Sequence, residues 1–372
     1  MVQFTKRIIL MKKVFAPKCL RGRPYYVTHD KFVRPCCYFV DHGWEPNAPK
    51  DESPKGEKLW PIHDVKWLRD PKTNLKNYKH IDDVFETKLY RDFYDSLLDA
   101  VDTGHIDNLP KRCINKCYTT NPESLSSQDK TNITGKDVTP RSWDLRNPYN
   151  NDQFVGSRKI QLDLTHRCRL GCPTCMRFIL DGPNKGERRQ VVNDEFTVED
   201  IAKIVGDGTK YRSYNFCGSI GDAIYTPQFM EIVKYIIDNS KDPKLSIVIH
   251  TNGSGKKTEW WKELYSLLRP KHDQVIFGVD GLEDTAPLYR KFINFNESFE
   301  AMKMGAEFGF ENNQWQYIVF KFNQHQVYEA EELAKQTGID FLVVKSDRFK
   351  KDDPHMPDKK WLPEDFVKRM GL

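Results

Sequence analysis

From about residue 155 onward, stretches with the periodicity of a β-strand alternate with stretches that have the periodicity of an amphipathic helix. In the first, Ile160, Leu162 and Leu164 alternate with polar residues, as expected of a strand with one buried face. Six strands are predicted, at residues 160–165, 213–218, 245–251, 274–280, 315–321 and 339–344. Because helix-like stretches separate them, the pattern predicts an α/β fold in which helices cover a parallel sheet. Six units rather than eight predict a partial, TIM-like (β/α)6 barrel.

The helix-like stretches begin and end at residues that favour helix termini. Thr197 and Asp200 have the spacing of a capping box, and Pro227 suits the first turn of the next helix. Gly338 lies where a C-cap glycine is expected. In barrels of this kind the loops after the carboxyl ends of the strands carry the chemistry, so the site is expected in those loops.

Three cysteines directly follow the first predicted strand. Cys168, Cys172 and Cys175 have the spacing C-x3-C-x2-C and supply three thiolates. A cubane iron–sulfur cluster normally takes four cysteines, so one iron would stay open, and an open coordination position distinguishes a catalytic metal from a structural one. The alternative is a zinc knuckle completed by His166 or a distant ligand, but this spacing is unusual for zinc, so the cluster is favoured.

This cysteine spacing after a first strand resembles that of the radical S-adenosylmethionine (SAM) enzymes. In that family the three cysteines hold a 4Fe–4S cluster, and the amino and carboxylate groups of SAM bind the fourth iron. One electron then cleaves SAM to methionine and a 5′-deoxyadenosyl radical, which takes a hydrogen atom from the substrate. The resemblance implies that the cofactors supply the chemistry and the protein positions them. Thr174 stands where the family often has an aromatic residue.

Three later loops resemble the family's SAM-binding segments, in the same order. The run from Cys217 to Asp222 resembles the Gly-Gly-Glu motif, with Asp222 in place of the glutamate. The resemblance implies that SAM is contacted by Gly218, Ser219, Gly221, Asp222, Thr251, Asn252 and Asp280. The simpler reading is that these are ordinary turns, since Asn-Gly and Asp-Gly are turn dipeptides. Cys217 has two readings. It is either a functional thiol, as a hydrogen donor or substrate ligand, or a small buried hydrophobic residue, and the structural reading is favoured.

The first 150 residues lack the strand–helix rhythm and are predicted to form a smaller, irregular, cysteine-rich domain. A hairpin is expected between residues 25–27 and 32–38. The cysteines resemble a Twitch or SPASM auxiliary-cluster module, which implies a second 4Fe–4S cluster on Cys19, Cys36, Cys113 and Cys117, with Cys37 as the substitute for Cys36. That module usually follows the barrel, and its usual hairpin glycine is replaced here by Asp30 or Lys31. The alternative is a small structural zinc site.

The predicted boundaries are 1–123 for this domain, 124–154 for a linker, 155–348 for the barrel and 349–372 for a tail.

The composition limits which partners and which cellular compartment are expected for this protein. Lys plus Arg number 58 against 53 Asp plus Glu, and this mild net charge of +5 argues against a nucleic-acid partner. No apolar run approaches the ~20 residues of a membrane span, and the amino terminus does not read as a signal peptide. A cytoplasmic protein is therefore expected, in which nine cysteines are metal ligands or reactive thiols rather than disulfides.

The function expected from the resemblance is that of a radical SAM oxidoreductase or maturase that cleaves SAM reductively. A peptide or protein is the first expected substrate, by analogy with relatives that have an auxiliary cluster. An electron donor such as flavodoxin or ferredoxin is implied. The main alternative is an iron–sulfur electron-transfer or redox-sensing protein that does not cleave SAM, which the imperfect Gly-Gly-Glu motif favours. A zinc-stabilised binding module is a third.

Overall fold

The computed structural model describes residues 14–15, 25–36, 70–103, 105, 109–110, 113, 117–119, 159–179, 185–189, 193–344, 346 and 354–358. The helices and strands in these ranges are, in chain order, β1 (Val14–Phe15), β2 (Tyr25–Val27), β3 (Val33–Arg34), α2 (Ile81–Phe85), α3 (Lys88–Thr103), β4 (Tyr118–Thr119), β5 (Lys159–Leu162), α6 (Val198–Val205), β6 (Ser213–Phe216), α7 (Phe229–Asn239), β7 (Ser246–Thr251), α8 (Thr258–Leu267), β8 (Gln274–Gly278), α9 (Ala286–Tyr289), α10 (Phe295–Glu307), β9 (Gln314–Ile318), α11 (Val327–Gln336) and β10 (Asp340–Val344). Short 3-10 turns at Pro71–Thr73, Leu75–Asn77, Ala223–Tyr225 and Gln324–Gln326 complete this set.

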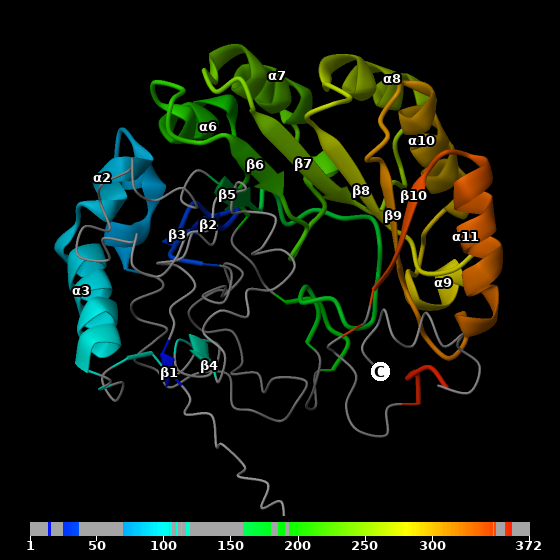
Figure 1. Ribbon diagram of the computed structural model, residues 1–372, viewed down its shortest axis with the longest axis horizontal. Helices are drawn as coiled ribbons and strands as arrows, with labels where there is room; N and C mark the ends of the chain where they lie inside the picture. The colour runs from blue at the N-terminus through cyan, green and yellow to red at the C-terminus, as the bar shows by residue number, and fades with distance from the viewer. Residues whose placement is uncertain are drawn as a thin grey trace, which may run out of the picture.

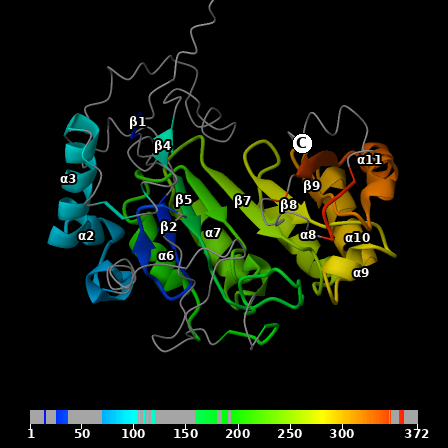
Figure 2. The ribbon, with the colours of Figure 1, turned by 90° about the horizontal axis from the view of Figure 1, so that it is seen from below.

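An eight-stranded sheet, in the order β10-β9-β8-β7-β6-β5-β2-β3, forms the centre of the molecule (Figure 1). The six predicted strands are present as β5 to β10, and consecutive strands pair in parallel. At least one α-helix separates each strand from the next, and α6, α7, α8, α10 and α11 lie along the outer side of the curved sheet. Seen from below, the strands run side by side across the molecule from β2 to β9 (Figure 2). The predicted partial (β/α) barrel is therefore confirmed.

The strand periodicity determines which face of the sheet meets the helices. Ile160 and Leu162 of β5, and the corresponding residues of β6 and β7, are fully buried in the apolar core. The alternate residues, such as Gln161, Asn215 and His250, are polar and partly exposed. Two predicted helix ends are also confirmed: Thr197 and Asp200 form the capping box of α6, and Gly338 has the positive φ of a C-cap glycine. The expectation for Pro227 is wrong, because α7 begins at Phe229 with Gln228 as its N-cap, so the proline lies before the helix.

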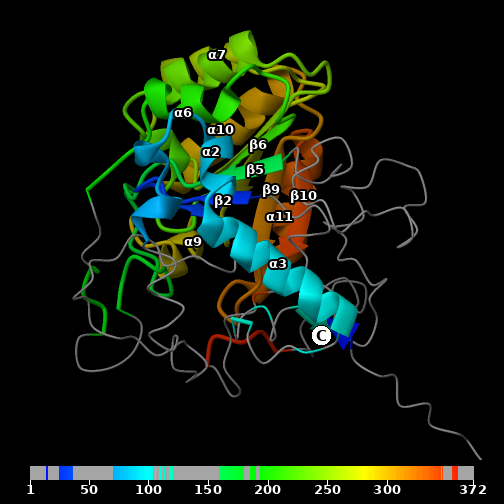
Figure 3. The same cartoon turned by 90° about the vertical axis from the view of Figure 1, so that its left-hand side faces the viewer.

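The predicted hairpin near the amino terminus is present, and it joins the main sheet. Strands β2 and β3 pair antiparallel, and β2 also pairs in parallel with β5, with Tyr26 opposite Gln161. Helices α2 and α3 lie on the hairpin side of the sheet, in front of it in Figure 3. The hydroxyl of Tyr90, in α3, donates to the Val33 carbonyl at 2.7 Å. The division into domains stays a prediction, because residues 124–154 and most of 349–372 lie outside the described ranges.

Lys31 is one of the two residues, with Asp30, at which the resembling module is expected to have glycine. Its φ is 68°, in the left-handed region, and its backbone N–H closes the turn by donating to the Thr28 carbonyl at 2.8 Å. This conformation costs a residue with a side chain about 1–2 kcal/mol. The interactions of the lysine side chain offset that cost.

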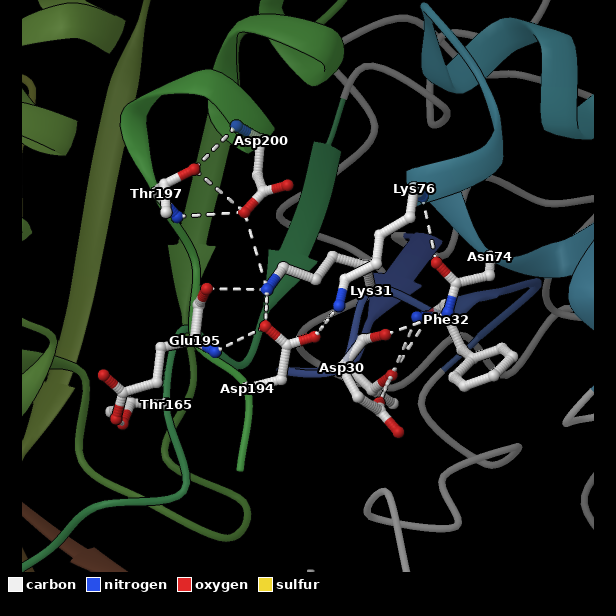
Figure 4. Close-up of polar contacts among 11 residues, drawn as sticks. Asp30, Lys31, Phe32, Asn74, Lys76, Thr165, Asp194, Glu195, Thr197 and Asp200 are labelled. Carbon is white, nitrogen blue, oxygen red and sulfur yellow. Dashed lines mark hydrogen bonds and ion pairs between the residues drawn. The ribbon is translucent and has the colours of Figure 1, made fainter. Parts of the chain in front are cut away.

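The Lys31 side chain connects the hairpin to the segment before α6 (Figure 4). Its ammonium group is 2% exposed, forms an ion pair with Asp194, lies 3.5 Å from Asp200, and donates to the Glu195 carbonyl at 2.6 Å. Lys76 pairs with the other oxygen of Asp194, but from a side chain that is 53% exposed. A buried cation therefore joins two segments that are more than 160 positions apart in the chain.

Replacing Lys31 by Met should lower the free energy of unfolding by about 2–4 kcal/mol, because buried carbonyl and carboxylate groups lose their donor. Lys76→Met is the matched control, since it removes an exposed partner of the same carboxylate and should cost under about 1 kcal/mol. Chemical denaturation followed by circular dichroism measures both. Equal effects of the two substitutions would contradict the role given to Lys31.

No helix among the described residues has the length and apolarity needed to cross a membrane.

Candidate functional site

The three predicted cluster cysteines lie in the loop that follows β5, and each is partly buried. The loop is held by its own backbone: the Cys175 N–H donates to the Cys172 carbonyl at 3.0 Å, and the Leu170 N–H lies 3.4 Å from the Cys168 sulfur. Arg177, only 5% exposed, donates to the Cys168 carbonyl at 3.0 Å and also to the Leu170 carbonyl. None of the three thiols is in a disulfide bond. They are therefore available as ligands.

The electrostatic environment of this loop suits a group that binds thiolates. Burial lowers the pKa of Arg177, but the nearby thiols of Cys168, Cys175 and Cys172 raise it, and the net result is a raised pKa. Burial, with a contribution from Asp222, raises the pKa of Cys168 to about 12. Burial likewise raises the pKa of Cys172, which the Arg290 charge opposes. A bound cationic centre reverses such shifts and deprotonates its thiol ligands.

The residues around the cysteine loop can be compared with what a single metal ion would need. Within the part of the chain that the structure describes, no three His, Cys, Asp or Glu side chains are gathered as a single metal ion requires. His166, the ligand considered for a zinc knuckle, instead lies beside His29, with ring centroids 5.5 Å apart. A cubane takes one thiolate for each iron, so its ligands stand further apart than those of one ion. The three thiols come from one loop, and all three interact electrostatically with the Arg177 guanidinium group.

Asp222 joins the cysteine loop to two of the predicted SAM-binding loops. Its carboxylate is 3% exposed and accepts from the Asn252 N–H at 2.7 Å and the Thr251 hydroxyl at 3.0 Å. Its own N–H donates to the Arg167 carbonyl at 2.8 Å, and the Asn252 side-chain amide lies 3.6 Å from the Cys168 sulfur. Burial raises the pKa of Asp222 to about 6, against the hydrogen bonds from Asn252 and Thr251 that lower it. The structure thus brings together residues that the sequence placed in three separate motifs.

The glycines of the 218–222 loop are required by close backbone contacts. A Cβ atom on Gly221 would overlap the Thr165 carbonyl oxygen, and one on Gly218 would lie 2.7 Å from the Gly221 carbonyl oxygen. The loop therefore packs against the chain that leads into the cysteines, and only a residue without a side chain fits.

Gly221→Ala should displace this loop and break the hydrogen bond between Asp222 and Arg167. We expect a loss of about 3 kcal/mol or more in stability and weaker equilibrium binding of SAM to the reconstituted protein. Gly309→Ala is the control for loss of stability alone, since its Cβ would meet no other atom but its φ of 83° strains the backbone, and it should leave SAM binding unchanged. Unchanged SAM binding in Gly221→Ala would contradict this role.

Asp280 follows β8 and is fully buried. Its carboxylate accepts from Arg290 Nε at 2.7 Å and from the Ile318 N–H at 2.8 Å. Arg290 is in turn one of the charges that act on Cys172. Asp280 therefore orients a cation beside the cysteine loop and is more than a turn former. Its contact with SAM stays a prediction.

Only part of the predicted auxiliary ligand set is described. Cys36, Cys113 and Cys117 are buried within the apolar core, whereas Cys19 and Cys37 lie outside the described residues. The second cluster and the choice between Cys36 and Cys37 therefore stay predictions.

Several residues of the site were given no role in the sequence analysis. Arg177 and Arg290 bring positive charge to the thiols, while Asp163 and Tyr26 form a buried polar contact on the same side of the sheet as Gln161. Asp163 gave one signal, a charged residue within an otherwise regular strand pattern. Tyr26 gave none, since its partner is 137 positions away.

The comparison with protein families agrees with the stretch that forms this site. Residues 162–334, which begin at the last residue of β5 and include all three cysteines, match the Radical SAM superfamily. The predicted resemblance is therefore confirmed for that stretch. No curated protein matches the chain at a significant level of sequence similarity.

Solved structures of similar fold have low identity to this chain. Streptococcus suis SuiB bound to S-adenosylmethionine is 13% identical, with a TM-score of 0.42, and the match covers 75% of this chain and 56% of SuiB. Native anSMEcpe with bound AdoMet is 17% identical, with a TM-score of 0.39, over 50% of this chain and 51% of the other. A radical SAM methyltransferase from Sphaerobacter thermophilus is 13% identical, with a TM-score of 0.38, over 57% and 63%. The chain thus spans little more than half the length of these proteins.

Proposed function

We propose that this protein is a radical SAM enzyme whose site lies at the carboxyl edge of β5 to β8. The observation that carries the proposal is the hydrogen-bonded connection between the cysteine loop and the loops of Asp222 and Asn252, all within the stretch that matches the superfamily. Cys168, Cys172 and Cys175 would hold three irons of a 4Fe–4S cluster, and SAM would bind the fourth. Bound there, the cluster and SAM supply a 5′-deoxyadenosyl radical that takes a hydrogen atom from the substrate.

The chain's own residues prepare the site for that chemistry. Arg177 places a buried positive charge among the three thiols, and this charge opposes the rise that burial causes in the pKa of Cys168 and Cys172. Asp222 fixes the backbone and side chain of Asn252 beside Cys168. Asp280 holds Arg290 next to Cys172. Most of these groups are buried, so the loops are set before any ligand arrives, which lowers the cost of binding.

We propose a peptide or protein as the substrate class, and a low-potential donor such as flavodoxin or ferredoxin as the electron source. The support is the resemblance of the amino-terminal cysteines to an auxiliary-cluster module, and the burial of Cys36, Cys113 and Cys117 is compatible with it. A cytoplasmic location is part of the same proposal.

The direct test is anaerobic reconstitution with iron and sulfide, followed by incubation with SAM and dithionite. The expected product is 5′-deoxyadenosine, detected by liquid chromatography and mass spectrometry, with none formed when dithionite is left out. If the cluster is present and no 5′-deoxyadenosine is formed, the enzymatic proposal is wrong. The electron-transfer alternative would then be favoured if SAM also failed to shift the electron paramagnetic resonance spectrum of the reduced cluster.

A further inference from the structure

A thiol, a carboxylate and a phenol lie on neighbouring strands, on the face of the sheet away from the helices. Tyr26 of β2 is in register with Gln161 of β5, and Gln161 with Asn215 of β6. Asp163 and Cys217 lie two residues beyond these partners, and side chains two apart share a face. Three different segments of the chain therefore bring their reactive groups together at this point.

One carboxylate connects the other two groups. The Cys217 thiol donates to Asp163 Oδ1 at 3.3 Å, with the Leu162 carbonyl as a longer alternative acceptor at 3.6 Å. The Tyr26 hydroxyl donates to Asp163 Oδ2. The Ser219 N–H donates to Oδ1 at 3.1 Å, so the carboxylate is also bonded to the predicted SAM-binding loop.

All three groups are buried, and the place of Cys217 in the chain gives this connection a direction. Tyr26 is 0% exposed, Asp163 is 1% exposed and Cys217 is 8% exposed. Cys217 directly precedes Gly218, so the thiol is the end nearest the candidate site, and the phenol is the innermost end. Burial, followed by the charge of Asp163, raises the pKa of both Tyr26 and Cys217, so both keep their protons at neutral pH.

The hydrogen bonds of Cys217 and Tyr26 to one carboxylate go beyond what packing of a small buried residue requires. An alanine or serine would fill the position of Cys217, and a phenylalanine would leave no hydroxyl to pair at position 26. Thiols and phenols are the protein groups that most readily give up a hydrogen atom. Their joint contact with one carboxylate supplies a path for the accompanying proton.

We propose that Cys217 donates a hydrogen atom to a carbon radical on the bound substrate, and that Tyr26 restores the thiol through Asp163. In the first step the S–H bond breaks, a C–H bond forms, and a thiyl radical remains on Cys217. In the second, Tyr26 gives one electron to the sulfur. Its phenol proton passes to Asp163 and from there to the sulfur, so Cys217 is again a thiol, Asp163 is again a carboxylate and Tyr26 holds the radical. A low-potential one-electron donor and a solvent proton then return Tyr26 to a phenol.

This inference rests on the proposed function, and it is tested without the substrate. The reconstituted protein is incubated with SAM and dithionite in D2O, and the deuterium content of the 5′-deoxyadenosine is measured. Thiol hydrogens exchange with solvent, so the wild-type product should carry one deuterium. Cys217→Ser keeps the size but has a stronger bond to hydrogen, and its product should carry several-fold less deuterium. Equal deuterium in both proteins overturns the role of Cys217 and leaves SAM cleavage intact, whereas absence of 5′-deoxyadenosine in every variant contradicts the proposed function and this inference together.

Tyr26→Phe and Tyr214→Phe form the matched pair for the second step. Both tyrosines are fully buried, but Tyr214 of β6 faces the helices. Rapid freezing after addition of SAM should trap a tyrosyl radical signal in wild type and Tyr214→Phe, and none in Tyr26→Phe. A tyrosyl signal that persists in Tyr26→Phe overturns the relay.

The role of the Asp163 carboxylate can be tested by a measurement that does not depend on turnover. Asp163→Asn removes a negative charge from beside the Cys217 thiol and should lower its pKa. Alkylation of Cys217 at pH 8, followed by peptide mass spectrometry, should therefore be several-fold faster than in wild type. An unchanged rate in a folded Asp163→Asn protein overturns the hydrogen-bonded relay.

Discussion

A variant with Cys168, Cys172 and Cys175 all replaced by Ala is expected to lose about four iron atoms per chain and to form no 5′-deoxyadenosine. The reason is that all three thiols come from one loop, which is held by backbone hydrogen bonds and by Arg177. Cys217 is not expected to substitute for them, since its thiol donates to Asp163. Iron and sulfide assays after anaerobic purification measure the first effect, and mass spectrometry of the nucleoside measures the second.

The matched control is a second triple variant, with Cys36, Cys113 and Cys117 replaced by Ala. If the amino-terminal cysteines hold a separate cubane, this variant should also lose about four irons while the SAM-dependent signal of the first cluster remains. Zinc without iron or sulfide in the wild-type protein would contradict both expectations. Full SAM cleavage by the first triple variant would end the radical SAM proposal.

Asp222→Ala is the second substitution with a large expected effect. It leaves the buried N–H of Asn252 and the Thr251 hydroxyl without their acceptor, at about 1–3 kcal/mol each. Because Asn252 also contacts the Cys168 sulfur, the disturbance reaches the cysteine loop. Loss of a group that orients metal ligands typically costs about 10–100-fold, and we expect SAM binding to weaken by that range, measured by equilibrium binding to the reconstituted protein.

Asp273→Ala provides the control for destabilisation alone. Asp273 is also fully buried and accepts from the Ile247 N–H at 2.7 Å, but it precedes β8 and lies at the opposite end of that strand from Asp280. Its replacement should lower stability without a change in SAM affinity beyond the loss of folded protein. If both variants weaken SAM binding equally, Asp222 acts through stability and the role proposed for it is wrong.

Much of the barrel could be predicted because its signals are local. The alternation around Ile160 and Leu162, the capping box at Thr197 and the glycine at position 338 each depend on residues a few positions apart. Parallel strands separated by helices bring their carboxyl ends to one edge, so the order of motifs along the chain also predicted that the cysteine loop meets Asp222 and Asn252.

The position of the hairpin could not be predicted in this way. The pattern of Tyr25–Val27 and Val33–Arg34 predicts that they pair with each other, but nothing local shows that β2 also pairs with β5. At the sequence level, Asp30 or Lys31 is a departure from the glycine of a known module. In the structure, Lys31 has a side chain that is needed elsewhere, at Asp194 and Glu195.

The sequence by itself predicts the parallel sheet, the helix ends and the three-thiol loop. These features depend on residue type, spacing and periodicity, because they follow from interactions between near neighbours along the chain. The contacts of Lys31 with Asp194, of Tyr26 with Asp163 and of Arg290 with Asp280 depend on which segments pack together. The first two join residues separated by well over a hundred positions, and a buried polar group is satisfied by whatever partner the packing of the whole chain brings within reach. Those contacts exist only in the folded molecule, and they supply the charge and the hydrogen-bonded thiol around the site.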